Sequence, residues 1–164
     1  MKRIFIGATC ALLGAVWIQA ADARIDVSSV IDKATAESLL GEKIKDLSPR
    51  NGDGKDGYYS KCNYYSVAPG KTLLIRVYQA AQDYSAQGEL DFVAKSTPKL
   101  KEVSGIGDKA MVTDGTASAL PARTLMLYVA KGNAFLTIGL SGFDDDSVAM
   151  DKAKTIAQKL LEHL

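Results

Sequence analysis

The side chains that most often perform acid–base and nucleophilic chemistry are scarce in this sequence. His163 is the only histidine, and it lies in the last two residues of the chain. A Ser-His-Asp or Cys-His site would therefore depend on a terminal side chain that is free to fray. A metal site built from histidine and cysteine fails for the same shortage. The sequence therefore favours a non-catalytic protein and predicts no metal and no cofactor.

Two glycine-rich segments look like cofactor motifs but lack the context that these motifs need. Segment 105–110 has the G-x-G-x-x-A spacing of a dinucleotide fingerprint, which requires a helix after it, whereas a strand is predicted here. Segment 51–57 resembles a calcium loop, but Lys55 takes a ligand position and Cys62 stands where a bidentate glutamate belongs. We therefore expect turns at both places.

Cys62 is the first candidate for a functional side chain. It lies in a predicted strand, and Ser60 and Tyr64, each two residues away, should point to the same side of that strand. This alternation predicts a buried, inert thiol within the sheet. A redox-sensitive or intermolecularly paired thiol is the alternative, because Cys62 is the only cysteine beyond the N-terminal leader described below.

An aromatic face on the predicted sheet is the second candidate. If the strands pair as their pattern indicates, several aromatic side chains and one arginine share the side of the sheet that helices leave open. Partial burial beneath loops or a dimer partner is the alternative interpretation. The candidate binding residues are Tyr59, Tyr65, Arg76, Tyr78 and Tyr128, with Met126 and Phe135 beside them.

The first 23 residues have the pattern of a Sec signal peptide. A basic start precedes an apolar run that ends at Ile18, shorter than the roughly 20 residues of a membrane-spanning helix. An A-x-A pattern ends at Ala23, so we expect cleavage after Ala23, with Ala20 as the second choice. A single mature domain, residues 24–164, would then be periplasmic or secreted and would have no membrane span.

The composition excludes other classes. Hydrophobic residues make up 47% and charged residues 24% of the 164 residues, as in an ordinary globular domain. Lysine plus arginine number 20 and aspartate plus glutamate 19, so the net charge is +1. Nucleic-acid binding needs a basic surplus that this sequence lacks.

Hydrophobic spacing predicts the elements that position these residues. No helix is predicted between the last three strands, so the sheet must be mainly antiparallel and the class α+β. We expect a five-stranded sheet, with hairpins over 58–80 and 124–140 and with the helices packed on one face. The predicted order, α-β-β-α-β-β-β-α, comprises helix 30–40, strands 58–67 and 71–80, helix 85–95, strands 109–113, 124–130 and 134–140, and helix 146–163.

The sequence also resembles known families. Segment 103–110, a strand, the Lys131-Gly132-Asn133 turn, another strand and an alanine-rich closing helix resemble a pattern in uncharacterised bacterial secreted proteins and lipoproteins. The helix that ends at Leu39-Leu40-Gly41 and the pair Cys62 and Tyr64 are similar to the early half of that pattern. The pattern is distantly similar to the extracellular sensor domain of a mycobacterial serine/threonine kinase. This resemblance implies an α+β extracytoplasmic domain that binds a ligand and has no catalytic residues to transfer.

Together these observations predict a non-catalytic periplasmic or secreted binding or interaction module. Its partner would be a small molecule or an envelope protein, and its state a monomer or homodimer. Two alternatives from other classes stay open. One is a small extracytoplasmic hydrolase that uses carboxylates or Cys62, and the other is a structural envelope protein or inhibitor that acts through a dimer surface.

Overall fold

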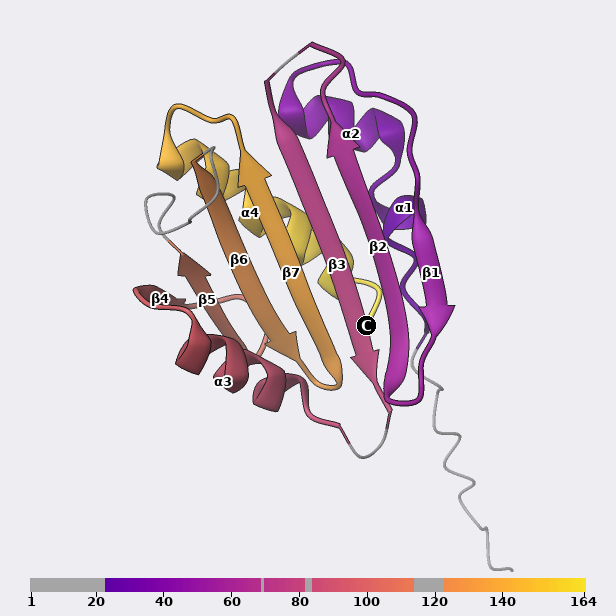
Figure 1. Cartoon of the computed structure of the whole chain (residues 1–164), viewed down its shortest axis with the longest axis vertical. Helices are drawn as coiled ribbons and strands as arrows, with labels where there is room; N and C mark the ends of the chain where they lie inside the picture. Colours follow the sequence, from indigo (N-terminus) through magenta and orange to yellow (C-terminus); the bar gives the residue numbers. More distant parts are fainter. Residues whose placement is uncertain (1–22, 69, 82–83, 114–122) are drawn as a thin grey trace, which may run out of the picture.

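The computed structural model describes residues 23–68, 70–81, 84–113 and 123–164. Apart from Ala23, the predicted signal peptide lies outside these residues. Figure 1 shows the elements in chain order. They are α1 (Val27–Val30), α2 (Lys33–Leu40), β1 (Arg50–Asp53), β2 (Gly57–Tyr65), β3 (Thr72–Ala80), α3 (Ala86–Ser96), β4 (Leu100–Val103), β5 (Lys109–Thr113), β6 (Thr124–Lys131), β7 (Ala134–Ser141) and α4 (Asp146–Leu161).

The strands form one seven-stranded antiparallel sheet, which confirms the α+β class. Their spatial order is β1-β2-β3-β7-β6-β5-β4 (Figure 1). The predicted hairpins β2–β3 and β6–β7 are confirmed, and the pairing of β3 with β7 joins the two halves of the sheet. The centre of the sheet is therefore made of the four longest hydrophobic strands.

The prediction of five strands is wrong, because two short edge strands carry no strand pattern of their own. β1 consists of Arg, Asn, Gly and Asp, and all four residues are exposed. Asn, Gly and Asp are depleted in strands, so the sequence of β1 favours a turn. The backbone pairs with β2, and Ser60 Oγ donates a hydrogen bond to Asn51 Oδ1 at 2.7 Å. β4 is likewise only four residues long and pairs with β5.

One face of the sheet, here called the helix face, carries the main core. Ile75, Leu127 and Ile138 from the central strands are fully buried there. α4 packs on β6 and β7 and buries its apolar stripe. That stripe consists of Ala149, Ala153, Ile156, Ala157 and Leu160.

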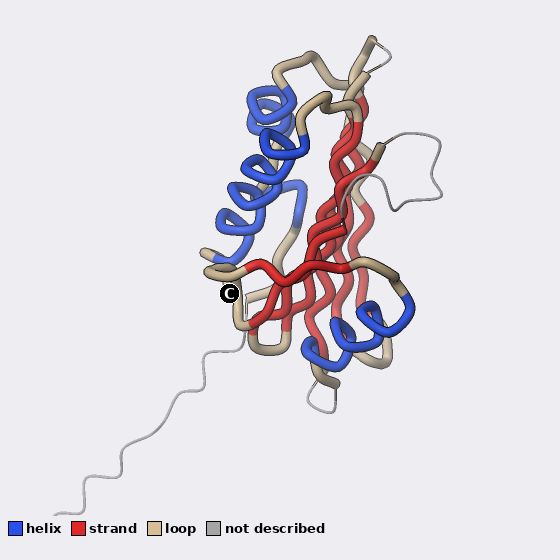
Figure 2. The backbone as a smooth tube through the Cα atoms, turned by 90° about the vertical axis from the view of Figure 1, so that its left-hand side faces the viewer, coloured by secondary structure: helices blue, strands red, loops and turns tan. Residues whose placement is uncertain are grey.

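The prediction that every helix packs on one face is wrong. α1, α2 and α4 cover the helix face, whereas α3 lies on the opposite face, here called the groove face (Figure 2). Ala86 and Leu90 of α3 are buried in a separate small cluster with Ala130, against Tyr128 and Phe135. α4 already covers β6 and β7 on the helix face, so the short stripe of α3 buries itself on the other side.

The predicted helix 30–40 is shorter in the structure: α2 covers residues 33–40, and Val30 is the last residue of α1, which begins before the predicted range. Asp32 breaks the pattern because its carboxylate accepts the Thr35 backbone N–H at 2.8 Å and so caps α2. Gly41 ends α2 in the left-handed region at φ 71°, a conformation that glycine adopts readily. The break between the helices is anchored by Tyr64, whose hydroxyl donates to the Ile31 carbonyl at 2.6 Å.

Candidate functional site

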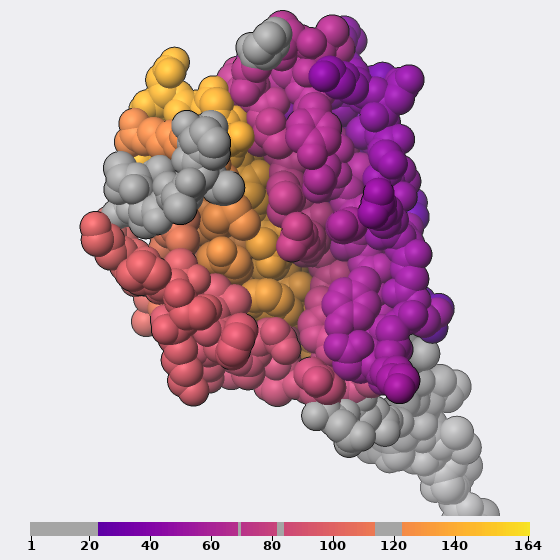
Figure 3. All heavy atoms as spheres, viewed as in Figure 1, coloured from indigo at the N-terminus to yellow at the C-terminus, as the bar shows by residue number. Residues whose placement is uncertain are grey.

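A groove runs over the groove face between α3 and strands β1 to β3. It has a volume of about 670 Å³, and we call it the central groove. Phe135 and Thr137 of β7 lie at its base, Glu89 of α3 lines one wall, and residues of β1 and β2 line the other. Figure 3 shows this face hollowed over β6 and β7. The size lies within the roughly 300–1,000 Å³ of typical small-molecule sites.

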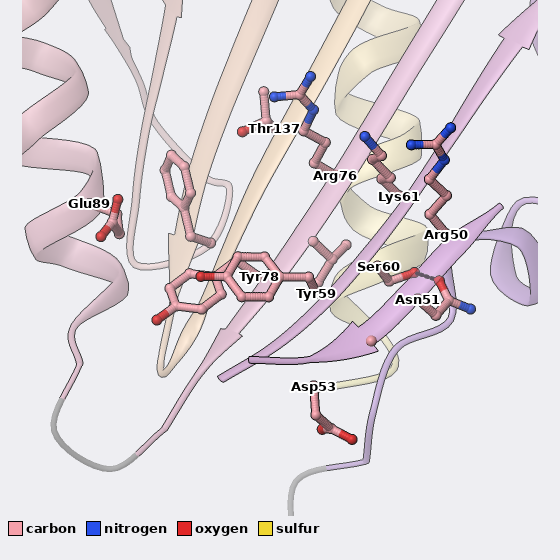
Figure 4. Close-up of a pocket in the computed structure, with 13 residues that line it drawn as sticks. Arg50, Asn51, Asp53, Tyr59, Ser60, Lys61, Arg76, Tyr78, Glu89 and Thr137 are labelled. Atoms are coloured by element: carbon pink, nitrogen blue, oxygen red, sulfur yellow. Dashed lines mark hydrogen bonds between the residues drawn. The ribbon is translucent and has the colours of Figure 1, made fainter. Parts of the chain in front are cut away.

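Three cationic side chains form a row along the β1–β3 side of the central groove. The register pairs Arg50 with Lys61 and Lys61 with Arg76, so β1, β2 and β3 each contribute one. Directly opposed residues of antiparallel strands project to the same face, and Figure 4 shows the three side chains extending in the same direction. Within the described residues, none of the three forms an ion pair. We call these three residues the cation row.

Three aromatic side chains form a second row beside the first. Tyr59 is paired with Tyr78, and Tyr78 with Phe135, again across three neighbouring strands. Each lies two residues along its strand from Lys61, Arg76 or Thr137, and therefore on the same face. The rings of Tyr59 and Tyr78 stack with centroids 4.6 Å apart and an interplanar angle of 21°. We call these three residues the aromatic row.

Both tyrosine hydroxyls of the aromatic row are tied to the turn after β1. Tyr59 donates to the Asp56 carboxylate, and Tyr78 donates to the Asp56 backbone carbonyl at 2.7 Å. The bond to Asp56 raises the pKa of Tyr59, and burial raises the pKa of Tyr78. Both groups therefore stay neutral phenols, held in place with their rings in the groove.

Two carboxylates also line the central groove. Asp53 at the end of β1 pairs with Arg24 at 2.8 Å, and Figure 4 shows its side chain directed away from the cation row. Glu89 lies on α3, across the groove from the cation row (Figure 4). The charges of the groove are therefore separated, with the cations on the β1–β3 side and Glu89 on the α3 side.

The structure places the predicted binding residues in three different environments. Tyr59, Arg76 and Tyr78 line the central groove together. Tyr65 is 47% exposed and lines a smaller neighbouring hollow of about 230 Å³ that shares Arg50 and Lys61 with the groove. Tyr128 lies on the predicted face, but α3 packs over it there.

Sequence reasoning missed Arg50 and Lys61 as groove residues. Lys61 alternates with Tyr59 in the predicted strand, so its place on the same face could have been found from that spacing. Arg50 could not, because its segment reads as a turn and only the backbone pairing with β2 brings it beside Lys61. Glu89 likewise depends on the unpredicted placement of α3.

Cys62 lies on the helix face, away from the central groove. It is 1% exposed within the main core cluster, and burial raises the pKa of its thiol. Its neighbour Tyr64 is fully buried on the same face. This confirms the predicted burial of the thiol, and the raised pKa keeps it in the unreactive protonated form.

The glycine motif at 105–110 forms a tight turn with a structural role. Gly105 and Gly107 have φ of 79° and 60°, which confirms the predicted tight turn before β5. A Cβ on Gly107 would lie 2.6 Å from the Ala130 carbonyl oxygen, so only glycine fits this close approach. Asp108 then reaches the β6–β7 turn, where its carboxylate pairs with Lys131 Nζ at 2.7 Å and accepts the Gly132 N–H at 2.8 Å.

The described residues contain no cluster of three or more histidine, cysteine or acidic side chains that could hold a metal ion. Among these residues, none of the helices has the length and apolar character needed to cross a membrane. No protein-family model matches the chain, and no curated protein matches its sequence significantly.

Proposed function

We propose that the protein is a non-catalytic, extracytoplasmic binding module that takes a small-molecule ligand in the central groove. The observation that carries this proposal is a groove of ligand size that combines an aromatic row with a row of unpaired cations. Binding sites typically join apolar, aromatic walls to a few convergent polar groups in this way. The fixed hydroxyls of Tyr59 and Tyr78 support a largely pre-formed site.

The chemistry of the groove favours binding over catalysis. The described residues that line it include tyrosines that stay neutral, two arginines and a lysine, but no histidine or cysteine. Its two carboxylates, Asp53 on β1 and Glu89 on α3, lie on different sides of the groove. Cys62, the nucleophile of the hydrolase alternative, is buried on the other face of the sheet. A hydrolase would need a nucleophile and a base within hydrogen-bond reach of each other.

The extracytoplasmic placement rests on the N-terminal sequence. A chain cleaved after Ala23 would keep buried Ile25, whose N–H donates to Gln79 Oε1 at 2.7 Å. It would lose the Ala23 carbonyl, which accepts a hydrogen bond from Gln79 Nε2 at 2.9 Å. Cleavage after Ala20 would keep both bonds. N-terminal sequencing of the exported protein separates the two, and a chain that retains residues 1–23 in the cytoplasm would contradict the placement.

Native mass spectrometry of protein purified from the periplasm tests the binding function. We expect an added mass that disappears on denaturation and that is lost in Tyr59→Ala, which removes a stacking ring that is 43% exposed. Phe92→Ala is the matched control, because Phe92 is an exposed aromatic side chain of α3 that does not line the groove. An added mass that persists unchanged in Tyr59→Ala would place the ligand elsewhere.

A further inference from the structure

We propose that the central groove selects a phosphate ester carried on a flat ring. The phosphate would lie at the cation row of Arg50, Lys61 and Arg76, and the ring at the aromatic row. This inference rests on the proposed binding function and adds the chemical class of the ligand. Four features of the groove carry it, namely the register of the cations, their lack of partners, the placement of the acids and the adjacency of the two rows.

The register concentrates positive charge at one place. Arg50, Lys61 and Arg76 come from adjacent strands, which lie about 4.8 Å apart, so the row spans about 10 Å at the backbone. Like charges directly opposite one another destabilise a sheet. Two such pairs in succession impose a cost on the free protein that a bound anion would remove.

Five lysines elsewhere in the described chain are neutralised by a carboxylate, whereas the cation row is not. Lys33, Lys43 and Lys71 each pair with a carboxylate, and so do Lys109 and Lys131. The cation row has no such partner among the described residues. The three charges are therefore available to a ligand.

The two carboxylates of the groove determine where the anionic group of a ligand could lie. Asp53 is engaged by Arg24 and points away from the row (Figure 4). Glu89 lies across the groove and would repel an anionic group placed near α3. The anionic end of a ligand would therefore lie toward β1–β3, while Glu89 could accept hydrogen bonds from hydroxyl or amine groups on the rest of the ligand.

The aromatic row lies beside the cation row, which is why we propose a ring in the ligand. Tyr59 and Tyr78 lie two residues along their strands from Lys61 and Arg76, a separation of about 7 Å. That separation fits a phosphate joined to a ring through a short linker such as a pentose. Tyr78 is 8% exposed and stacks beneath Tyr59, so the ring of Tyr59, which is 43% exposed, offers the accessible aromatic surface beside the charges.

Phosphate matches the cation row better than carboxylate does. A phosphate monoester carries nearly two negative charges at neutral pH and three acceptor oxygens. Guanidinium groups bind such oxygens in a bidentate fork, and the row supplies two of them together with one ammonium. A single carboxylate offers one charge and two oxygens to the same three cations.

Titration calorimetry of the full chain with four probes tests this inference. The probes are inorganic phosphate, adenosine, adenosine monophosphate and benzoate. We expect adenosine monophosphate to bind most tightly and its affinity to fall with added salt. Lys61→Gln and Arg76→Gln should each weaken it by about tenfold and leave adenosine unchanged. Lys154→Gln, which removes the same charge from α4 on the helix face, should change neither affinity.

Each other outcome decides against the inference. Equal affinity for adenosine and its monophosphate would overturn the choice of anion and leave the groove as a site for neutral rings. Benzoate binding as tightly as the monophosphate would overturn the choice of phosphate. Unchanged affinity in both variants would remove the cation row from the site. If none of the four probes binds, the ligand class is wrong, and the native mass measurement decides the binding function separately.

Discussion

Cys62 and Tyr64 lie on one face of β2, and both hold the core together. The Tyr64 hydroxyl satisfies the carbonyl at the break between α1 and α2, and Cys62 packs among buried apolar side chains. Their neighbours Tyr59 and Lys61 alternate onto the groove face. The pleat of β2 therefore places the structural residues on one face of the sheet and the candidate ligand-binding residues on the other.

The first prediction concerns the Cys62 thiol. Its burial and raised pKa predict that it resists alkylation in the folded protein at mildly alkaline pH and reacts rapidly once urea unfolds the chain. The rate of reaction with a thiol reagent, measured across the unfolding transition, checks this. As a second readout, Cys62→Ser should lose about 1–3 kcal/mol of stability because it buries a poorly satisfied hydroxyl. Stoichiometric labelling of the native protein within minutes would contradict the prediction.

At the scale of elements, Asp108 joins two turns that are distant in sequence. Its carboxylate holds the turn between β6 and β7, and Gly107 allows the close approach that brings it there. The G-x-G spacing that imitates a nucleotide motif therefore serves the packing of one hairpin against another turn.

The second prediction follows from the pKa of Asp108. The hydrogen bond with Lys131 and the Gly132 N–H hold this pKa below its usual value of 3.8. A lowered pKa in the folded state means that the carboxylate stabilises the fold at neutral pH and loses this effect as pH falls below about 3.8 through the folded pKa. Asp108→Asn should be less stable at neutral pH and closer to the wild type in acid. Chemical denaturation at several pH values measures this, and a constant difference across them would contradict the account.

The elements that could be predicted from the sequence are those with their own apolar pattern. The four central strands, β5, α3 and α4 all carry such a pattern, and their bounds fall within two residues of the prediction. β1 could not be predicted, because its pairing depends on the backbone of β2 rather than on its side chains. The cation row includes Arg50 of β1, so only part of the candidate site could be predicted from the sequence.

The placement of α3 shows a second physical limit on what could be predicted from the sequence. Periodicity identified its buried stripe, with Ala86 and Leu90, but a stripe does not say which face of a sheet it covers. That choice depends on what the other helices leave free. For this reason Tyr128 could be assigned to the correct face and yet be covered.

At the scale of the whole molecule, the net charge is near zero but unevenly distributed. Five described lysines each pair with a carboxylate, whereas the central groove keeps three cations unpaired. Functional sites commonly retain such unfavourable contacts at some expense of stability. In the proposed site, the aromatic row and the cation row contact two parts of one ligand.

The third prediction is that the cation row lowers the stability of the free protein. Lys61→Gln relieves two cross-strand repulsions and should raise the free energy of unfolding by about 0.2–1 kcal/mol at low salt. Added salt should narrow the difference, because it screens the repulsion. Urea denaturation of Lys61→Gln beside Lys154→Gln measures this. A clear loss of stability in Lys61→Gln alone would show that the row serves the fold.

The central claim is that a ligand binds in the central groove, and mapping by nuclear magnetic resonance tests it most directly. Backbone amide shifts would be recorded while neutral, cationic and anionic ring compounds are added to the labelled protein. The account predicts that the shifts concentrate at Lys61, Arg76 and Thr137, in the strands that form the groove. Shifts that concentrate on the helix face, or no shifts in the groove with any compound, would contradict it.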